Sequence, residues 1–292
     1  MQFSKIKLLN DCIYFDIVIR GLCEAFEELN IKHEIVETVD QDDQDLYLVC
    51  VTHHLHQQMP LNYISYNFEQ LITDKKLSPQ FFDRLRNAKQ VWDYSLENIK
   101  VLEKNEVKNV VHIPFGYFRG MDVENNSSEW KEKPFDWSFV GSVNDNRAYK
   151  LGALIQQYFN SATTKAKCLI TNSCWGKSLD RMYANTKIGI NVHFYTGKTI
   201  LEVHRIVPMI ANGVWVVSER SDDPWYDDAY KSMVTYLPNG FKPPQLAACV
   251  DLISNKMDIQ TIKNELDKRR KILIEQHSYV KYLSNKRTDL II

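Results

Sequence analysis

A carboxylate and a guanidinium stand three residues apart at Glu202 and Arg205, shortly after an apolar run of strand length at 187–194. Apolar residues in 200–212 recur at helical spacing, so a helix there would carry both side chains on one face. In this position a carboxylate can accept hydrogen bonds from a diol such as ribose, and an arginine can pair with phosphate. Because a helix amino end also favours anions, the pattern around Thr199 predicts a site for a nucleoside diphosphate. An ordinary ion pair on a helix surface is the alternative that spacing leaves open.

Small and aromatic residues follow two other predicted strands. Gly141 and Ser142 end the run FVGS, where a glycine lets a ligand approach the backbone, although the sequence does not match G-x-G-x-x-G. Asn172 and Trp175 lie in TNSCWG, directly after another apolar run. The indole of Trp175 would either stack on a base or pack against the sheet. A simple turn at Gly141 is the alternative to a ligand-binding loop.

Three histidines in THHLH follow the continuous apolar run LYLVCV. A strand of that composition is buried on both faces of a parallel sheet, so His53 and His54 would lie at its carboxyl end. A general base is one interpretation of these side chains, and a structural role is another. H-H-x-H also suggests a metal site, but its spacing fits no standard zinc pattern, so no metal ligand is predicted. Asp11, at the end of the first predicted strand, would stand behind the histidines.

Strand-like and helix-like segments alternate along the chain, which favours parallel α/β sheets. The predicted strands are 5–10, 32–39, 46–51, 63–68, 90–95, 109–116, 137–142, 165–171, 187–194, 214–219 and 233–238. A polar stretch without periodicity at 116–136 interrupts the alternation. We therefore expect two Rossmann-like domains facing across a cleft, 1–118 and 119–277, with a C-terminal helix at about 278–292 packing back on the first. Ligands of such folds bind beyond the carboxyl ends of the strands.

Composition narrows the class of protein. The 292 residues carry 36 Lys and Arg against 37 Asp and Glu, a net charge of -1. That balance argues against a nucleic-acid-binding protein, which usually has a basic excess. The six cysteines form no C-x-x-C pair, so reduced thiols in a cytoplasmic protein are expected. The start MQFSKIKLLND lacks the apolar core of a signal peptide, and no apolar run is long enough for a membrane span.

Five segments, in order, resemble small GT-B glycosyltransferases of the group 1-like type, which occur in bacteria and large DNA viruses. The segments are YNFEQL, VWDYSLEN, VHIPFGY, WSFVGS and the stretch from YANTKIGINVHFY through LEVHRIVPMIANGVWVVSE, spread over 63–221. The resemblance implies that the C-terminal domain holds a nucleoside diphosphate sugar and that the N-terminal domain meets an acceptor hydroxyl. The sugar nucleotide is then a substrate, and neither a cofactor nor a metal ion is expected.

The resemblance also assigns roles to residues. In many relatives a glutamate on the helix after the penultimate strand binds the donor ribose, a role that falls to Glu202, with Arg205 nearby on phosphate. The expected donor-binding residues are Gly141, Ser142, Asn172, Trp175, His193, Tyr195, Thr199, Glu202 and Arg205. The acceptor is expected to be a glycan, a glycoprotein or a lipid-linked hydroxyl. The resemblance does not identify it further, because the N-terminal stretch of the chain resembles the family least.

One departure from the family pattern concerns the stereochemistry. Many retaining GT-B enzymes carry two glutamates eight positions apart, whereas Ile210 lies eight positions after Glu202 and Phe194 eight positions before it. Inverting and retaining chemistry therefore both stay open. The expected catalytic residues are His53, His54 and Asp11. A GT-B-like scaffold that binds a nucleotide or a sugar without turnover is the alternative function, and the sequence predicts no oligomeric state.

Overall fold

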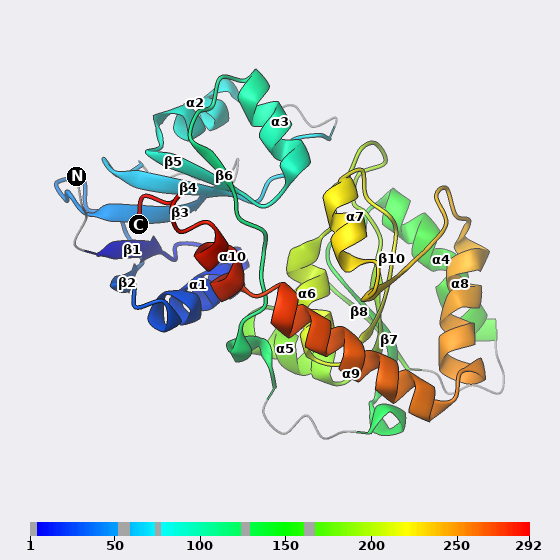
Figure 1. Ribbon diagram of the computed structural model, residues 1–292. Helices are drawn as coiled ribbons and strands as arrows, with labels where there is room; N and C mark the ends of the chain where they lie inside the picture. The colour runs from blue at the N-terminus through cyan, green and yellow to red at the C-terminus, as the bar shows by residue number, and fades with distance from the viewer. Residues whose placement is uncertain (1–4, 52–58, 74–76, 124–128, 161–166) are drawn as a thin grey trace. The chain divides into compact units, whose positions relative to one another are not determined.

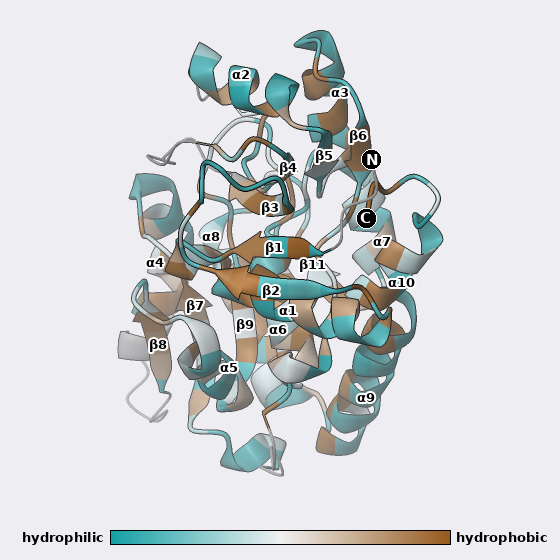
Figure 2. Ribbon diagram, turned by 90° about the vertical axis from the view of Figure 1, so that its left-hand side faces the viewer, coloured by the Kyte–Doolittle hydropathy of each residue, from teal (hydrophilic) through white to brown (hydrophobic). Residues whose placement is uncertain are grey.

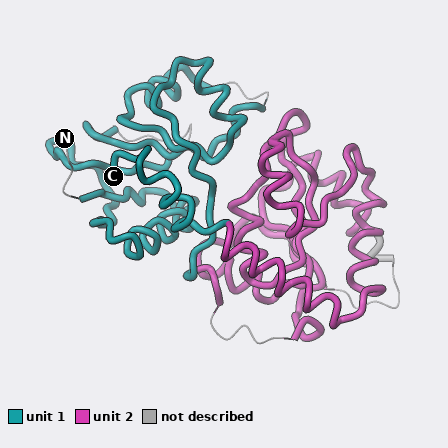
Figure 3. The backbone as a smooth tube through the Cα atoms, viewed as in Figure 1, with its two compact units in different colours: residues 1–120, 277–292 teal, residues 121–276 magenta. Residues whose placement is uncertain are grey.

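The chain folds into two compact units (Figure 3). Each unit is built on a parallel sheet. The computed structural model describes residues 5–51, 59–73, 77–123, 129–160 and 167–292. Unit 1 comprises Met1–Gly120 and His277–Ile292, and unit 2 comprises Met121–Gln276. The predicted fold class, α/β with two Rossmann-like sheets, is confirmed.

Unit 1 contains a six-stranded sheet with the order β2-β1-β3-β4-β5-β6, paired in parallel throughout (Figure 1). The strands are β1 (Ile6–Leu9), β2 (His33–Val36), β3 (Leu46–Val51), β4 (Tyr63–Asn67), β5 (Gln90–Asp93) and β6 (Val110–His112). Leu46, Leu48 and Val49 are 0% exposed, as expected for a strand covered on both faces. Because β3 lies between β1 and β4, the segments that follow these three strands leave the sheet at one edge.

Helices and a C-terminal segment cover this sheet. The helices of unit 1 are η1 (Ile13–Phe15), α1 (Asp16–Glu28), α2 (Pro79–Asn87), α3 (Leu96–Lys104), η2 (Arg119–Met121, partly in unit 1) and α10 (Tyr279–Asn285). α10, red in Figure 1, lies against α1, blue. Tyr279 is fully buried there, and a Cβ atom at Gly21 would lie 2.7 Å from its ring. The glycine in α1 therefore makes room for the tyrosine.

Unit 2 contains a five-stranded parallel sheet with the order β11-β10-β9-β7-β8. The strands are β7 (Phe135–Val140), β8 (Cys168–Thr171), β9 (Thr186–Asn191), β10 (Trp215–Ser218) and β11 (Val234–Tyr236). The helices are η3 (Trp130–Glu132), α4 (Asp145–Asn160), α5 (Gly176–Ala184), α6 (Val203–Ala211), α7 (Pro224–Tyr230), α8 (Pro243–Asp251), η4 (Leu252–Lys256) and α9 (Ile259–Gln276). Apolar side chains of β7, β9 and β10 pack against α8 in a single core.

The sequence pattern does not indicate α7 in unit 2. The segment after β10 looks like an acidic, aromatic loop, yet residues Pro224–Tyr230 form α7. Asp223 caps the helix by accepting a hydrogen bond from Trp225 N at 3.1 Å, and a proline follows at the first helical position. Two fully buried tyrosines, Tyr226 and Tyr230, anchor it. The helix is short, so capping and burial stabilise it where periodicity is too brief to be recognised.

Strands and helices of unit 1 differ in hydropathy. Hydrophobic residues concentrate in strands such as β1 and β3, whereas polar residues run along helices such as α2 (Figure 2). Among the described residues, no helix combines the length and the apolar content needed to cross a bilayer.

Candidate functional site

A polar cluster in unit 2 lies where β7, β9 and β10 end. β9 is paired with β7 on one side and with β10 on the other, and Asn191 at the end of β9 stands in register with Ser218 at the end of β10. Asn191 Nδ2 donates to Ser218 Oγ at 2.9 Å, and both residues are fully buried. The loops after these strands therefore leave the sheet from a rigid polar edge.

Glu202 is the N-cap residue of α6 and is not within the helix, contrary to the sequence prediction. Its side chain is 4% exposed. Oε2 accepts hydrogen bonds from Asn191 Nδ2 at 3.0 Å and from His193 Nδ1 at 2.8 Å. The carboxylate thus belongs to a buried network, and the simple surface pair with Arg205 that the spacing left open does not form.

Both ring nitrogens of His193 face oxygen atoms that accept hydrogen bonds. Its Nε2 lies 2.9 Å from the carbonyl oxygen of Arg220, and its Nδ1 lies 2.8 Å from Glu202 Oε2. Burial alone would lower the pKa of His193, but the charge of Glu202 and the hydrogen bond to it raise that pKa. Burial opposes ionisation of Glu202 too, yet His193 and Arg205 hold the pKa of the carboxyl well below its ordinary value. Both directions favour an ion pair between the two buried side chains.

Two guanidinium groups converge on Gly141, just after β7. This residue has φ +141°, and a Cβ atom there would lie 3.2 Å from Arg205 Nη2 and 3.3 Å from Arg147 Nη1. Arg147, 3% exposed, donates to Val192 O at 2.9 Å and to Ser142 O at 2.8 Å. Burial and the neighbouring Arg205 lower the pKa of Arg147 to about 10. The absence of a side chain at Gly141 lets both positive groups approach the backbone.

The loop after β10 adds a second carboxylate. Glu219 accepts hydrogen bonds from the backbone N–H of His193 at 2.8 Å and from Lys150 Nζ at 2.8 Å and 2.9 Å. Arg147, Arg205 and Lys150 are basic, the pKa of His193 is raised, and Glu202 and Glu219 are acidic. Basic side chains therefore outnumber carboxylates in the cluster, which suits a phosphate-bearing ligand.

The other predicted donor-binding residues make fewer hydrogen bonds to the polar cluster. Thr199 N donates to Asp222 Oδ2 at 2.9 Å, and Tyr195 O lies 3.4 Å from Asn146 Nδ2. Asn172 and Trp175 follow β8, the strand next to β7, and their segment is tied to the site because Gly141 N donates to Thr171 O at 2.8 Å. Trp175 is 37% exposed.

The predicted catalytic residues belong to unit 1. Asp11 lies after β1, is partly buried, and has a pKa raised by burial. His53 and His54 lie outside the described residues. The structure therefore describes Asp11 alone among the three.

The predicted site residues do not include several members of the cluster, namely Arg147, Lys150, Asn191, Ser218 and Glu219. Of these, Ser218 and Glu219 begin the segment 218–228, which the sequence suggested as a possible lining of the cleft. Arg147 stands in a run of helix-capping residues, so its type and position suggested only a helix start. Asn191 and Ser218 are ordinary residues inside strands, and their meeting depends on the β9–β10 register. A signal did exist for Glu219, because it follows an apolar strand directly.

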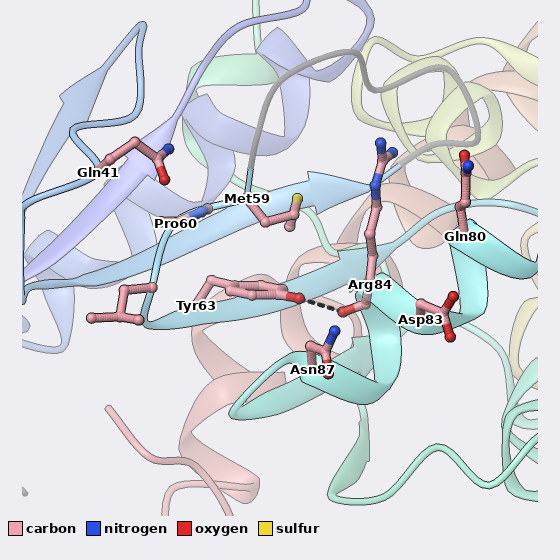
Figure 4. Close-up of a pocket in the computed structure, with 9 residues that line it drawn as sticks. Gln41, Met59, Pro60, Tyr63, Gln80, Asp83, Arg84 and Asn87 are labelled. Carbon is pink, nitrogen blue, oxygen red and sulfur yellow. Dashed lines mark hydrogen bonds between the residues drawn. The ribbon is translucent and has the colours of Figure 1, made fainter.

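A pocket of about 490 Å³ lies elsewhere in unit 1 (Figure 4). Leu61 and Tyr63, at the amino end of β4, contribute to its lining, and the Tyr63 hydroxyl donates to the carbonyl oxygen of Arg84 in α2 at 2.5 Å. β4 ends at Asn67, so the pocket lies at the opposite end of the strand from the ligand-binding edge expected for this fold. None of its described lining residues is a predicted site residue.

No group of three or more His, Cys, Asp or Glu side chains is arranged to hold a metal ion within the part of the chain that the structure describes.

Comparison with protein sequences gives a distant relative. No family model matches the chain. An uncharacterized protein of Acanthamoeba polyphaga mimivirus is 28% identical over 205 residues, which cover 68% of this chain. The match spans 62% of that protein, less than two thirds of its length.

Solved structures share the fold. HepE of Anabaena, in complex with UDP and glucose, matches with a TM-score of 0.61 at 11% identity, covering 98% of this chain and 100% of that one. An alpha-glucosyltransferase in complex with UDP-glucose and DNA containing an abasic site matches with a TM-score of 0.64 at 11% identity, covering 98% and 99%. A glycosyltransferase of Rickettsia africae gives 0.59 at 10% identity, covering 99% and 98%.

Proposed function

We propose that this chain, whose fold is that of the GT-B glycosyltransferases, transfers a sugar from a nucleoside diphosphate sugar to an acceptor hydroxyl on a glycan, a glycoprotein or a lipid-linked molecule. The observation that carries the proposal is the convergence of Arg147 and Arg205 on Gly141, beyond the carboxyl end of β7. Ligands of Rossmann-like sheets bind at this edge. Paired guanidinium groups are suited to phosphate oxygens.

The cluster supports departure of a diphosphate. Sugar transfer breaks the bond between the anomeric carbon and the diphosphate oxygen, and the electron pair stays on the diphosphate. Arg147 and Arg205 can stabilise that charge in a partly buried site without reorganising. Because these groups supply the positive charge, we propose that the reaction needs no metal ion.

Glu202 and the residues around it would set the orientation of the nucleotide. Oε2 of Glu202 is already occupied by Asn191 and His193, whereas Oε1 lies 3.7 Å from Arg147 Nη2. We propose that Oε1 meets the ribose diol and that Trp175 lies against the base. The remaining predicted donor residues, Ser142, Asn172, Tyr195 and Thr199, would contribute through their loops.

Unit 1 would bind the acceptor. Its sheet edge carries Asp11, and His53 and His54 follow β3 in the sequence. One of these groups would accept the proton of the acceptor hydroxyl as the new bond forms. The raised pKa of Asp11 suits a base, since a more basic carboxylate accepts a proton more readily.

The structural neighbours suggest which donor to test first. HepE was solved with UDP and glucose and the alpha-glucosyltransferase with UDP-glucose. UDP-glucose is therefore the first donor that we propose for this chain. We do not propose DNA as an acceptor for this chain, because its net charge is -1.

Thermal shift against UDP, GDP, CDP and TDP, with and without EDTA, tests the donor site. A bound nucleotide raises the midpoint by mass action, by an amount equivalent to about 2.7 kcal/mol at 100 times the Kd. We expect one nucleotide to stabilise the protein equally with and without EDTA. Arg205→Gln and Arg147→Gln should each weaken binding at least tenfold.

Lys271→Gln, on the exposed face of α9, is the matched control and should leave the shift intact. Absence of a shift with all four nucleotides would contradict the proposed donor site. Binding without release of UDP from UDP-glucose, in water or with acceptors, would favour the non-catalytic scaffold instead.

A further inference from the structure

Four polar residues at the ends of β4 and β5 and at the start of α3 are completely buried. Asn67, Asp93, Ser95 and Asn98 are all 0% exposed. Burying a carboxylate is unfavourable unless hydrogen bonds compensate it. Here they do, so these residues form a fixed polar network at the carboxyl edge of the sheet.

The hydrogen bonds of the network centre on Asp93. Oδ2 accepts from Asn67 Nδ2 at 2.6 Å, and Oδ1 accepts from Ser95 N at 2.8 Å and from Asn98 Nδ2 at 3.1 Å. The carboxylate thereby fixes the orientation of both amide side chains. Each amide then has its remaining polar atom directed at the segment that follows β4.

That segment is held by its backbone. Glu69 N donates to Asn67 Oδ1 at 3.0 Å, and Glu69 O accepts from Asn98 Nδ2 at 2.7 Å and from Asn67 Nδ2 at 3.2 Å. Leu71 N donates to Asn98 Oδ1 at 2.8 Å. Both backbone polar groups of Glu69 are therefore fixed by side chains that Asp93 positions.

The fixed segment contains an aromatic residue and an acidic residue. Phe68 and Glu69 are both partly exposed. The Phe68 ring is held by Tyr66 at 4.3 Å, by Tyr94 at 5.7 Å and by Phe15 at 5.9 Å between ring centroids. An aromatic ring can pack on the apolar face of a sugar, and a carboxylate can accept hydrogen bonds from its hydroxyls.

We propose that Glu69 is the carboxylate that binds the attacking hydroxyl of the acceptor and takes its proton, and that Phe68 packs on the acceptor's sugar ring. In the step, the acceptor oxygen forms a bond to the anomeric carbon, the bond to the diphosphate breaks, its electron pair leaves with the diphosphate, and the proton moves to Glu69. Asp93 and Asn98 are positioning residues. This inference rests on the proposed function and changes one part of it, because Glu69 takes the proton in place of Asp11, His53 or His54.

Release of UDP from UDP-glucose tests the role, with water as the simplest acceptor. Glu69→Gln keeps the shape but removes the base, so kcat should fall at least 100-fold, in line with the contribution of general bases. Glu69→Asp should restore part of the rate. The Kd for UDP should be unchanged in both variants, because the proposed nucleotide site belongs to unit 2. Glu103→Gln, an exposed position on α3, is the matched control and should behave as wild type.

Asn98→Ala tests the positioning of Glu69 separately from proton transfer to Glu69. It leaves Glu69 in the sequence but releases its backbone, so kcat should fall at least tenfold with the Kd for UDP unchanged and the protein folded by circular dichroism. A purely structural role of Glu69 would not give partial rescue of kcat by Glu69→Asp together with an unchanged Kd for UDP.

Two outcomes would overturn the inference. The first is a Glu69→Gln variant that hydrolyses UDP-glucose at the wild-type rate. The second is loss of hydrolysis in Asp11→Asn while Glu69→Gln stays active, which would identify Asp11 as the base. Two results with wild-type protein would instead reject the proposed function itself: binding of UDP without its release from UDP-glucose, and failure to bind any nucleotide.

Discussion

At the scale of single residues, Gly141 has the largest influence on the proposed donor site. Its φ of +141° is uncommon for any residue with a side chain, and its missing Cβ leaves the space that Arg147 and Arg205 approach. Backbone conformation and charge placement therefore depend on the same position. The sequence identifies the glycine, but it does not identify the two arginines as its neighbours.

Gly141→Ala should weaken nucleotide binding more than it weakens folding. The added methyl group would lie 3.2 Å from Arg205 Nη2, so the guanidinium groups must shift, and we expect the Kd for the preferred nucleotide to rise at least tenfold. Isothermal titration calorimetry measures the Kd, and thermal unfolding measures the accompanying loss of stability.

Gly152→Ala provides the control, because a Cβ atom there meets nothing within 4 Å and the residue lies inside α4. Alanine at that position should stabilise the helix by about 0.5–1 kcal/mol and leave the Kd unchanged. Equal Kd values for wild type and Gly141→Ala would contradict the role given to this glycine.

At the scale of elements, the ion pair of His193 and Glu202 joins the loop after β9 to the start of α6. The raised pKa of His193 means that its contribution to stability is complete below its ordinary value of 6.5 and is lost as pH rises through the raised pKa. The lowered pKa of Glu202 means that its contribution is present above its ordinary value of 4.5 and is lost as pH falls through the lowered pKa. The pair therefore stabilises unit 2 most between these two ordinary values.

His193→Gln should accordingly destabilise unit 2 most at about pH 5.5–6.5, and the difference from wild type should narrow as pH rises. Glutamine can still hydrogen-bond but carries no charge, so the change isolates the ion pair. Urea unfolding at several pH values between 5.5 and 9 measures the difference. A constant difference across that range would show that His193 is not charged in the folded protein.

The elements themselves could largely be predicted from sequence, because continuous apolar runs such as LYLVCV can be accommodated only as buried parallel strands. α7 could not, since its stability comes from the Asp223 cap and from tyrosines that are buried only in the tertiary structure. For the site, the strand ends identify Gly141, Glu202 and Arg205. The partners of Glu202 could not be predicted. Asn191 and His193 lie at or just after the end of β9 and Arg147 follows β7, and they contact Glu202 because these two strands are neighbours in the sheet.

At the scale of the whole molecule, the chain crosses from unit 1 to unit 2 and back again. The returning segment is bound to the outgoing one, since Tyr117 N donates to His277 O at 2.7 Å and Tyr279 N donates to Tyr117 O at 3.0 Å. Tyr279 then fills the space left by Gly21 and contacts the Phe115 ring at 5.5 Å between centroids. Unit 1 is thus completed by residues from the opposite end of the sequence.

Tyr279→Ala should destabilise unit 1 by about 3–5 kcal/mol, the usual cost of truncating a buried aromatic side chain. Unit 2 carries the proposed nucleotide site, so nucleotide binding should persist after unit 1 has unfolded in intermediate urea. Tyr279→Phe keeps the ring and should cost much less. If both units unfolded in a single transition, and nucleotide binding were lost in that transition, the prediction that unit 2 stays folded without unit 1 would be wrong.

The return of the chain to unit 1 also has a consequence during synthesis. Gly120 leaves the ribosome long before Tyr279, and at roughly 5–20 residues per second the interval between them is on the order of ten to thirty seconds. Throughout that time α1 has Gly21 uncovered, while the contiguous unit 2 is being produced and can fold. A pause in translation before Tyr279 would therefore prolong the time during which unit 1 lacks its last helix.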